Sequence, residues 1–559
     1  MPGQSSYLRH LPQVLWSTES GPEPFLGQVL CVFEKILTGI ADGAPIRSGD
    51  AEYPPIKEVI DELPKLFNSW STRPEFLPWL ASWVALELEP TWTEYQKRKL
   101  ITQIVSIYRL RGLEAGLHAY LDIYVQTPAR PRIAIDDGSA LLCARLKDDS
   151  TATLSTVAYS QAVSFSATGT GAGTSRTILI RPSGVAVDST NHYFVVDQGV
   201  EEDDNGNEAL PFPALWRLSS TGEVAYTSAS PLPLPEPVDD GALYRTASAA
   251  VVDNFDRCSV VSVGEPTSIN SVRSSLVRLA PPDYERTVVL SQATTPRLPA
   301  VRPVDMVLDA AQNFVILDRG AHLISDPPSG FPAAPKIVVV REGGGQVTTE
   351  EHALANVAEP TALLIEPGGT FILADASDQF AESTTSKPGD LLRLDPNDDW
   401  SATSLLADVP EGLNPLVFPT ALAWESEDAL LVCDVGLRWK FEGDQSNRSM
   451  AEPATIFRVD LSQDPPVIVR ITNDRRLVSP TKMMLDRRGN LIIADRGEAL
   501  RGFSVKRNWR ARPSEFGVIV HFSRRRPTTN DERNRIRRGI GRVLEEQKPS
   551  HAAWWLKSQ

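Results

Sequence analysis

The sequence predicts a multi-domain protein in which a small, mostly helical α/β domain is split by an inserted all-β, six-bladed propeller. Three observations predict this fold class: a repeat that occurs six times in the middle of the chain, helical periodicity before the repeats, and a strand–helix–strand pattern after them. The expected boundaries are residues 1–150 for the first part of the split domain, 151–508 for the propeller and 509–559 for the second part.

Each repeat has two acidic positions nine residues apart, and each position closes a short apolar run. Successive repeats follow one another at intervals of 56 to 65 residues. Only Ser262 departs from an acidic residue at the second position. The six pairs are Asp188/Asp197, Asp253/Ser262, Asp309/Asp318, Glu366/Asp375, Glu425/Asp434 and Asp486/Asp495.

The two apolar runs of a repeat flank a polar turn, which predicts a β-hairpin. A third run follows in several repeats, as at Leu215–Leu218 and Ile456–Val459, and the remaining residues have room for a fourth strand. Four strands per repeat are typical of a β-propeller, in which each blade buries its faces against its neighbours. A proline often leads the first run, at a strand entrance where a missing N–H is tolerated. The pattern resembles the NHL-type propeller repeat, with longer loops.

Length, cysteine usage and hydropathy limit the class of protein. A chain of 559 residues predicts two or three domains. Its four cysteines are far apart and form no CxxC pair, which argues against a disulfide scaffold or a structural zinc site. The sequence shows neither a secretion signal nor an apolar run long enough to span a membrane. We therefore expect a protein that is cytoplasmic at assembly and that lacks a transmembrane segment.

Charge is distributed unevenly along the chain. The formal net charge is −15, yet residues 501–542 contain 13 basic and three acidic residues. A basic segment on an acidic protein predicts docking against an acidic partner surface. A solvated basic face without a partner is the alternative interpretation. Nucleic-acid binding is not expected, because the basic run Arg524–Arg526 is brief and has few aromatic residues around it for base stacking.

The first 135 residues predict a set of helices followed by a strand. Apolar residues recur with helical spacing in 25–38, 76–84 and 91–110, and a short helix is expected over 113–125. Trp79 and Trp83 lie four residues apart, on one face of the second helix, and are expected to serve as core or subunit-interface anchors. Arg111-Gly112 is a helix stop signal, and Arg132–Ile135 reads as a strand.

The last 50 residues predict a strand, a helix and a final strand. Phe516–Phe522 and Ala552–Leu556 are the strands, and Asn530 is a good N-cap for the helix between them. The helix has an apolar stripe at Ile536, Ile540, Val543 and Leu544, and Pro549 ends it. This segment is too small to be stable alone. We therefore expect it to complete the domain begun by the head, across an inserted propeller whose ends lie close together.

Four segments in order carry a resemblance to a known family: Tyr7–Pro12, Phe76–Trp83, Tyr108–Leu117 and Glu546–His551. They resemble the phage tail protein I-like family, whose members are baseplate wedge proteins of contractile phage tails and related contractile injection systems. The resemblance covers about residues 1–135 and 510–559. Ser550 and Ala552 depart from the family's usual Ala and Thr, and the propeller is not part of the family's core.

The resemblance implies a structural role in baseplate assembly, without enzymatic activity. The implied partners are other wedge proteins, sheath, tube hub or tail fibre components, with several copies around a six-fold particle. That particle would be intracellular, membrane-anchored or released. The interface candidates are Trp79, Trp83, Arg111, Gly112, Arg524, Arg525, Arg526, Lys548, Pro549 and His551.

The sequence predicts no catalytic, cofactor or metal site. The repeat positions that could carry chemistry are Asp188, Asp197, Asp309, Asp318, Asp375, Asp434, Asp486 and Asp495. Because most blades share them, we expect these carboxylates to accept backbone N–H groups at turns. Two alternatives stay open: a calcium-dependent propeller hydrolase, since oxygen ligands suit calcium, and a propeller that binds a glycan or receptor on a cell surface.

Overall fold

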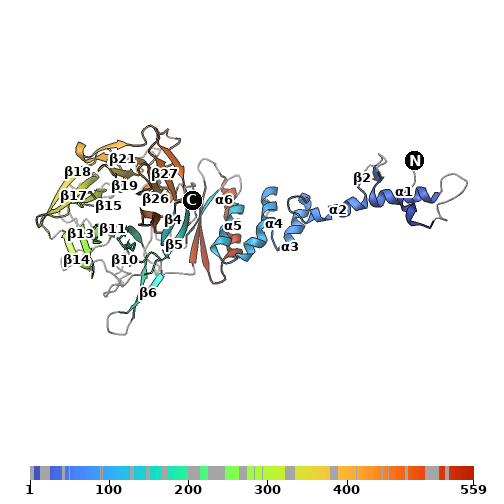
Figure 1. Ribbon diagram of the computed structural model, residues 1–559, viewed down its shortest axis with the longest axis horizontal. Coiled ribbons are helices and arrows are strands. Elements are labelled where there is room, and N and C mark those ends of the chain that lie inside the picture. The colour runs from blue at the N-terminus through green and yellow to red at the C-terminus, as the bar shows by residue number, and fades with distance from the viewer. Residues whose placement is uncertain are drawn as a thin grey trace. The chain divides into compact units, whose positions relative to one another are not determined.

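A computed structural model of the chain divides it into two compact units, which are described separately (Figure 1). The first unit comprises residues 1–128 and 542–550, and the second comprises 129–541 and 551–559. The residues that the structure describes are 5–12, 25–40, 45–48, 51–88, 90, 92–125, 131–136, 138–146, 152–159, 161–166, 173–179, 181–198, 214–223, 246–263, 274–282, 284–291, 294–320, 334–377, 388–410, 412–442, 445–450, 452–472, 476–497, 515–522 and 528–558.

The first unit is helical, as predicted. Its elements are the short helix η1 (Ser6–His10), α1 (Phe25–Thr38), a small hairpin of β1 (Ile46–Ser48) and β2 (Ala51–Tyr53), α2 (Ile56–Leu66), η3 (Pro74–Phe76), α3 (Leu77–Trp83), α4 (Glu94–Arg109) and α5 (Glu114–Tyr124). The last residues of α6 (Asn530–Gln547) also belong to it. The sequence analysis did not foresee the hairpin or α2.

Local capping fixes where α4 begins and ends. The Thr93 side chain accepts the backbone N–H of Gln96, and the Gln96 side chain accepts that of Thr93, which forms a capping box. The Gln96 amide also donates to the carbonyl oxygens of Ile123 and Tyr124, so α4 is tied to the end of α5. Gly112 follows α4 with a φ of +82°, a left-handed conformation that favours glycine and ends the helix.

The described residues of the second unit form six sheets that lie in a ring, and we call them the sheet ring (Figure 1). The first sheet is β8 (Pro182–Val187), β9 (Tyr193–Asp197) and β10 (Ala214–Leu218). The second is β11 (Thr246–Val252), β12 (Cys258–Val263), β13 (Ser275–Ala280) and β14 (Glu285–Leu290). The third is β15 (Pro303–Leu308), β16 (Phe314–Asp318), β17 (Lys336–Gly343) and β18 (Gln346–Ala353).

The fourth sheet is β19 (Pro360–Ile365), β20 (Phe371–Asp375), β21 (Asp390–Asp395) and β22 (Ser401–Ser404), with η4 (Pro396–Asp398) before its last strand. The fifth is β23 (Pro419–Trp424), β24 (Ala429–Asp434), β27 (Thr455–Asp460) and β28 (Val467–Arg470). The sixth is β29 (Pro480–Leu485), β30 (Asn490–Asp495), β4 (Ala140–Arg145) and β5 (Thr153–Tyr159). Two hairpins stand outside these sheets: β6 (Gln161–Ser166) with β7 (Gly173–Ile178), and β25 (Leu437–Glu442) with β26 (Gln445–Met450).

The first strands of the six sheets contact one another in a closed cycle, β8–β11–β15–β19–β23–β29–β8. Side-chain hydroxyls cross several of these junctions. Thr361 donates to the carbonyl of Pro419 at 2.6 Å, Thr420 to that of Pro480 at 3.0 Å, and Thr481 to that of Pro182 at 2.8 Å. The last bond joins the sixth sheet to the first and closes the cycle. This arrangement is that of a β-propeller.

The sixth sheet is built from both ends of the propeller sequence, and it changes one predicted boundary. β30 pairs with β4 in antiparallel register, with Asn490 opposite Arg145 and Asp495 opposite Ala140. Residues 140–146 therefore belong to the sheet ring rather than to the head, to which the predicted boundary at residue 150 assigns them. The physical reason is closure, because a sheet completed by strands from both ends locks the ring as sequence-adjacent strands alone do not.

A separate three-stranded sheet contains the ends that flank the ring sequence. β31 (Glu515–His521) pairs with β3 (Arg132–Asp136) in antiparallel and with β32 (Ala553–Ser558) in parallel register. The indole of Trp555 lies over Gly517, where a Cβ would approach the ring to 1.9 Å, so only glycine fits. The predicted head and tail strands thus pair across the insertion.

This three-stranded sheet groups with the ring, not with the helices, which differs from the predicted single head–tail domain. Ala134 and Ile519 pack with Val478 of the sixth-sheet segment in one buried cluster, and Trp555 covers it. The stripe of α6 is buried as predicted. Its N-cap is Thr529 rather than Asn530, since the Thr529 hydroxyl accepts the Glu532 N–H at 3.2 Å.

The ring core consists of apolar clusters between neighbouring sheets. Their second strands are buried on both faces, as at Phe194–Val196 and Ile492–Ala494. None of the helices in the described ranges is both long and apolar enough to cross a membrane.

Truncation of a β4 side chain should destabilise the ring if closure depends on this strand. Leu142 is 2 % exposed and packs with the fifth and sixth sheets, so Leu142→Ala is expected to lower the free energy of unfolding of the second unit by about 2–5 kcal/mol. Val469→Ala, at a half-exposed position of β28, is the matched control and should change it little. Urea denaturation measures both. If Leu142→Ala and Val469→Ala both lower the free energy of unfolding by the same small amount, closure of the ring by β4 is contradicted.

Candidate functional site

The acidic residue that ends the second strand of a repeat accepts hydrogen bonds from backbone N–H groups just before the first strand. Asp434 accepts the backbone N–H groups of Val417 and Phe418 through its carboxylate, and that of Gly436 at 2.6 Å. Asp318, Asp375 and Asp495 repeat the three bonds at equivalent residues, and Asp197 accepts the N–H of Arg181 at 2.7 Å. These carboxylates are buried. Their oxygens are occupied by backbone donors.

The acidic residue that ends the first strand caps the hairpin turn. Asp309 accepts the N–H groups of Ala311 and Asn313, both at 2.8 Å, and Asp486 accepts those of Arg488 and Asn490, both at 2.8 Å. Asp188 does the same for Thr190 and His192. Both sets of acidic residues, which we call the two acidic columns, thus accept backbone N–H groups, and those at the second position include buried ones, whose loss would be costly.

Where the first acidic residue faces an arginine on the third strand, the two form an ion pair. Arg393 donates to both carboxylate oxygens of Glu366 at 2.8 Å, and Arg217 donates to Asp188 at 2.7 Å. Burial raises the pKa of Glu366, but the bonds from Arg393 and Thr370 outweigh it, so the net pKa is lowered. Arg458 and Glu425 form the same pair in the fifth sheet.

The axis of the sheet ring is occupied by an ion pair between the third and sixth sheets. The Lys482 ammonium on β29 lies 2.6 Å from Oδ2 of Asp305 on β15, and this oxygen also accepts the N–H of Leu363 at 2.8 Å. These two strands occupy opposite places in the cycle of six. The other first strands carry Gly or Ala at the equivalent position: Gly184, Ala249, Ala362 and Ala421. Small residues leave room for one pair to span the axis.

The described residues offer no metal centre at either acidic column. No three His, Cys, Asp or Glu side chains among them are grouped so as to hold a metal ion. His192 has its pKa lowered by burial and by Arg217, and it contacts Thr190 and Asp188. Cys143, Cys258 and Cys433 are free thiols, and Cys258 and Cys433 are fully buried.

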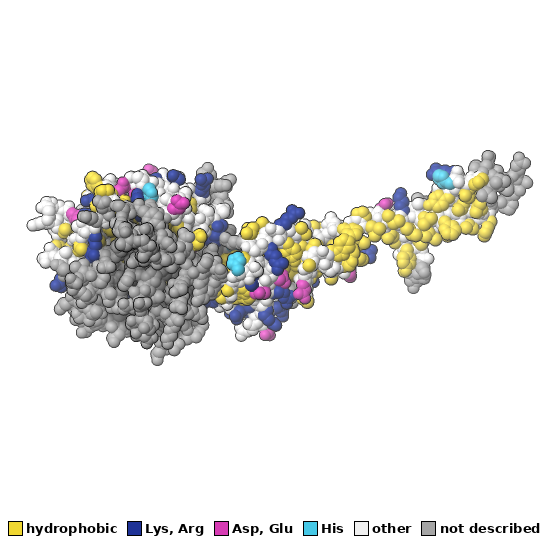
Figure 2. Space-filling view, turned by 90° about the horizontal axis from the view of Figure 1, so that it is seen from below, with side chains coloured by type: hydrophobic (Ala, Val, Ile, Leu, Met, Phe, Trp, Pro, Cys, Tyr) yellow, Lys and Arg dark blue, Asp and Glu magenta, His cyan; other side chains and the backbone are white. Residues whose placement is uncertain are grey.

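The helical unit presents a different kind of surface. Among the described residues, nineteen of the twenty-four exposed large hydrophobic side chains lie between residues 25 and 113, and five lie in the second unit. Figure 2 shows hydrophobic side chains gathered over α1 and α2. A folded protein in solution rarely leaves so many apolar side chains exposed unless they meet a partner.

Helix α2 shows this most clearly, because no residue of it is buried. Ile56, Val59, Ile60 and Leu63 have the i, i+3, i+4, i+7 spacing of a single face, and they are 44 to 56 % exposed. The opposite face has Lys57, Glu58, Asp61, Glu62 and Lys65. Sequence reasoning missed α2, although its apolar spacing is the signal that could have found it.

Helix α1 contacts α2 and continues the apolar surface. Five of its large side chains are 40 to 79 % exposed, and among its described residues only Gly27 is buried. The exposed side chains are Phe25, Val32, Phe33, Ile36 and Leu37. Glu34 lies toward η1, where hydrogen bonds from Ser5 and Ser6 lower its pKa.

Two predicted interface residues lie in an exposed aromatic cluster. Trp79 and Trp83 are 41 % and 64 % exposed, and their rings are 4.9 Å apart. Phe67 contacts both rings, at 5.7 and 5.6 Å, and Phe76 packs edge-on against Trp79. Exposed, mutually packed aromatic rings are typical anchors of protein interfaces. We call α1, α2 and this cluster the apolar head surface.

The structure brings together two predicted motifs from opposite ends of the chain. The Gly112 N–H donates to the Gln547 carbonyl at 2.9 Å, and Pro549 lies within 3.9 Å of the place where a Gly112 Cβ would stand. Arg111 and His551 are exposed, and Lys548 pairs with Glu545 at 3.5 Å. Gly112 and Pro549 therefore act in folding, by joining α4 and α6.

The remaining predicted interface residues, Arg524, Arg525 and Arg526, lie outside the described residues. The described part of the basic segment includes the α6 arginines, of which Arg535, Arg537, Arg538 and Arg542 are exposed. Arg542 lies 3.6 Å from Glu87. The axis pair was not predicted from the sequence, and of the apolar head surface only Trp79 and Trp83 were predicted as interface residues.

Part of the helical unit is similar to a known protein family. Residues 50–128 match the model of a family described as phage tail protein (Tail_P2_I). This segment contains α2, the aromatic cluster, α4 and α5. No curated protein sequence matches the chain.

Solved structures similar to the chain are β-propeller proteins at low similarity. They include a structure titled YCF48 bound to D1 peptide (11 % identity, 65 % of this chain and 95 % of that one, TM-score 0.33). A putative gluconolactonase matches at 12 % identity, over 55 % and 89 %, with a TM-score of 0.30. The gluconolactonase XC5397 from Xanthomonas campestris matches at 12 %, over 54 % and 86 %, with a TM-score of 0.31. These values are too low to transfer an activity.

The axis pair can be tested by a double-mutant cycle. Asp305→Asn keeps an acceptor for the Leu363 N–H but leaves the Lys482 ammonium without its counter-charge, so it is expected to cost about 3–5 kcal/mol of unfolding free energy. Adding Lys482→Met should recover most of this loss. Urea denaturation measures the unfolding free energy of each variant. If the losses of the two single variants simply add in the double variant, direct coupling of Asp305 and Lys482 is contradicted.

Metal removal tests the alternative interpretation of the acidic columns. Because backbone N–H groups occupy the carboxylates, EDTA is expected to change the thermal unfolding temperature of the purified protein by less than about 1 °C. Scanning calorimetry with and without added calcium measures this. A drop of several degrees that calcium reverses would favour the calcium-dependent hydrolase.

Proposed function

We propose that this chain is a structural baseplate component of a phage-tail-like particle, and that the apolar head surface docks it onto neighbouring subunits. The observation that carries the proposal is the exposure of this surface, including an α2 without a buried residue, largely within the segment that matches the phage tail family model. Most of a short helix's stability comes from burial of its apolar face, and α2 buries no residue within its own chain, so a partner would supply this burial.

The chemistry of the surface favours a protein partner. An amphipathic helix with i, i+3, i+4, i+7 anchors fits an apolar groove on another protein. Membrane-surface helices instead carry a strongly basic polar face. The polar face of α2 has three acidic and two basic residues, which does not attract anionic lipid. We therefore assign the head surface to contacts with other particle subunits.

The finer assignment is a wedge protein of a contractile injection system. Support comes from the order of the head and tail motifs and from the contact of Gly112 with the end of α6, which joins them. In this proposal the sheet ring is a six-bladed, NHL-like propeller inserted as a peripheral module, and the protein is not an enzyme. Sheath, hub or fibre proteins are the further partners proposed.

Introduction of charge on the apolar face of α2 tests the docking surface. The double variant Val59→Glu/Ile60→Glu places two carboxylates on the exposed apolar face and is expected to reduce the amount of chain in sedimented particles at least about tenfold. The matched control is Val467→Glu/Val469→Glu, at two valines of β28 that are 47 and 45 % exposed. Particles pelleted from producing cells are quantified by mass spectrometry.

Folding must be shown to be intact for this comparison. Circular dichroism of the purified variants checks it, and Trp83→Ala provides a second, milder change at the aromatic cluster. If both head variants and the β28 control are found in sedimented particles in the same amount as the wild-type chain, the proposed docking role is overturned.

A further inference from the structure

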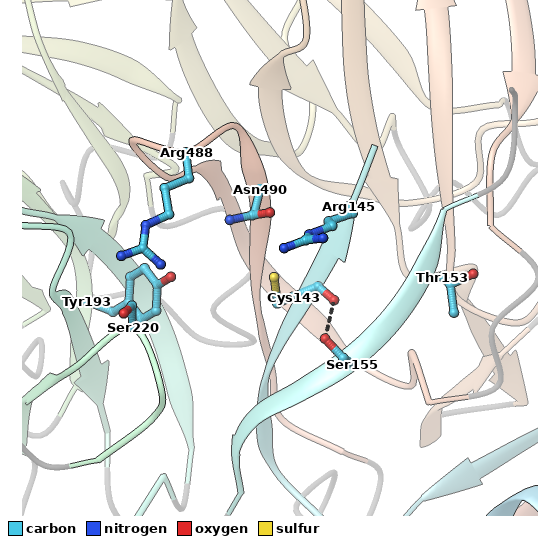
Figure 3. A pocket seen from close by; sticks show the side chains of 8 residues that line it. All are labelled: Cys143, Arg145, Thr153, Ser155, Tyr193, Ser220, Arg488 and Asn490. Carbon is cyan, nitrogen blue, oxygen red and sulfur yellow. Dashed lines mark hydrogen bonds between the residues drawn. The ribbon is translucent and has the colours of Figure 1, made fainter. Parts of the chain in front are cut away.

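A cavity of about 520 Å³ lies between the sixth and first sheets of the ring, on the side of the hairpin turns (Figure 3). It is lined by Cys143, Arg145, Thr153, Ser155, Tyr193, Ser220, Arg488 and Asn490. Every lining residue except Cys143 has a hydroxyl, an amide or a guanidinium group, and none is acidic. Cavities that bind small molecules usually measure roughly 300–1,000 Å³.

The register of the sixth sheet explains why polar groups converge there. Arg145 stands opposite Asn490 on one side and Thr153 on the other, so three strands place these side chains in one row. Cys143 and Ser155 form the next row on the same face. Leu141, also on this face, packs into the apolar core toward the first sheet. The face thus changes from apolar to polar along β4.

The sixth sheet, like the third with Val339, lacks an arginine that the other four sheets carry at one position of the third strand. In each sheet, one residue of the third strand pairs with the second acidic position of the repeat. Three residues further along this strand is Arg217 in the first sheet, Arg393 in the fourth and Arg458 in the fifth. Each of these arginines reaches across to the first acidic residue of its own repeat. In the sixth sheet the same position is Cys143. Its short side chain leaves open the space that an arginine fills elsewhere.

In the sixth sheet the first acidic residue is Asp486, and it accepts hydrogen bonds from groups other than an arginine. Asp486 accepts the Tyr193 hydroxyl at 3.1 Å and the side-chain amides of Asn490 and Asn191 at 2.9 and 3.3 Å, besides two backbone N–H groups. Burial raises the pKa of Tyr193 to about 12, and Asp486 adds to the shift. The carboxylate therefore has its donors already and does not need the two arginines of the cavity.

Within the described part of the chain, neither the Arg145 nor the Arg488 guanidinium has a carboxylate partner. Figure 3 shows both side chains directed into the cavity, from the end of β4 and from the β29–β30 turn. Burial raises the pKa of the Cys143 thiol, and the nearby Asp486 raises it further, which favours the protonated thiol over the nucleophilic thiolate. The site is therefore suited to binding rather than to covalent chemistry.

We propose that this cavity binds an acidic sugar, a hydroxylated ring that carries a carboxylate or a phosphate. The two guanidinium groups supply charged, directional donors for the anionic group. Thr153, Ser155, Ser220 and Asn490 supply hydrogen bonds for ring hydroxyls. The lining has no Leu, Ile, Val or Met side chain that could receive an acyl chain, and it has only one aromatic ring. This binding role is independent of the assembly role proposed for the head.

The test measures binding of D-glucuronate and D-glucose 6-phosphate to the full chain by isothermal titration calorimetry, with D-glucose and inorganic phosphate as probes lacking one of the two features. Glucuronate carries a carboxylate and glucose 6-phosphate carries a phosphate, so comparison of their affinities shows which anionic group the cavity prefers. We expect one acidic sugar to bind at least about tenfold more tightly than glucose and than phosphate. Arg145→Gln and Arg488→Gln should each weaken that binding about tenfold or more.

Two variants assign the binding to this cavity. Cys143→Arg introduces the residue that four other sheets carry at this position, and it should abolish binding while circular dichroism shows an unchanged fold. Arg487→Gln removes one positive charge beside the cavity without touching its lining, and it should bind as wild type does.

Three results would overturn the proposal. The first is no binding of either acidic sugar by the wild-type chain below about 10 mM. The second is binding that Cys143→Arg and the two glutamine variants leave unchanged. The third is inorganic phosphate binding as tightly as the acidic sugars, which would show a bare anion site without sugar recognition.

Discussion

The structure depends on one strand pairing, that of β30 with β4. A small sheet cannot bury both of its faces, so each sheet of the ring relies on its two neighbours, and the first and last must meet. Pairing of Asn490–Asp495 with Ala140–Arg145 completes the last sheet from both ends of the propeller sequence. The same pairing brings the two flanking segments together, where β3 and β31 form a second antiparallel pair. Closure of the ring therefore also explains how a large insertion leaves its host sheet intact.

Within the ring, the repeated residues serve folding and the departures from the repeat point to function. The recurring acids occupy buried backbone donors, and the recurring arginines neutralise acids at the turns. Asp305 and Lys482 depart from a set of small residues, and together they fill the axis. Cys143 departs from a set of arginines and opens a cavity with two available guanidinium groups. The helical head contrasts with the ring, because its apolar face is left uncovered by its own chain.

Much of the fold follows from local sequence, and the rest depends on long-range contacts. Helical periodicity predicted α1 with its observed ends, and the acidic pairs predicted the hairpins. β4 escaped prediction because Ala140–Arg145 lacks the acidic mark of the repeat and pairs with a strand at the far end of the propeller. α2 was missed although its apolar spacing is regular. Asn530 was predicted as the N-cap of α6, but the hydroxyl of Thr529 accepts the N–H that a cap would accept. Of the site residues, Trp79 and Trp83 were named from sequence, but their exposure depends on how α3 packs, and the pairing of Asp305 with Lys482 requires the ring geometry.

Electron cryomicroscopy of particles sedimented from producing cells tests the central claim most directly. The account predicts that this chain is present in stoichiometric amount at the baseplate, with α1, α2 and the Trp79–Trp83 cluster buried against other subunits. A particle in which this chain is present with these helices facing solvent would contradict the docking role of the head. Complete absence of the chain from sedimented particles would contradict the structural function itself.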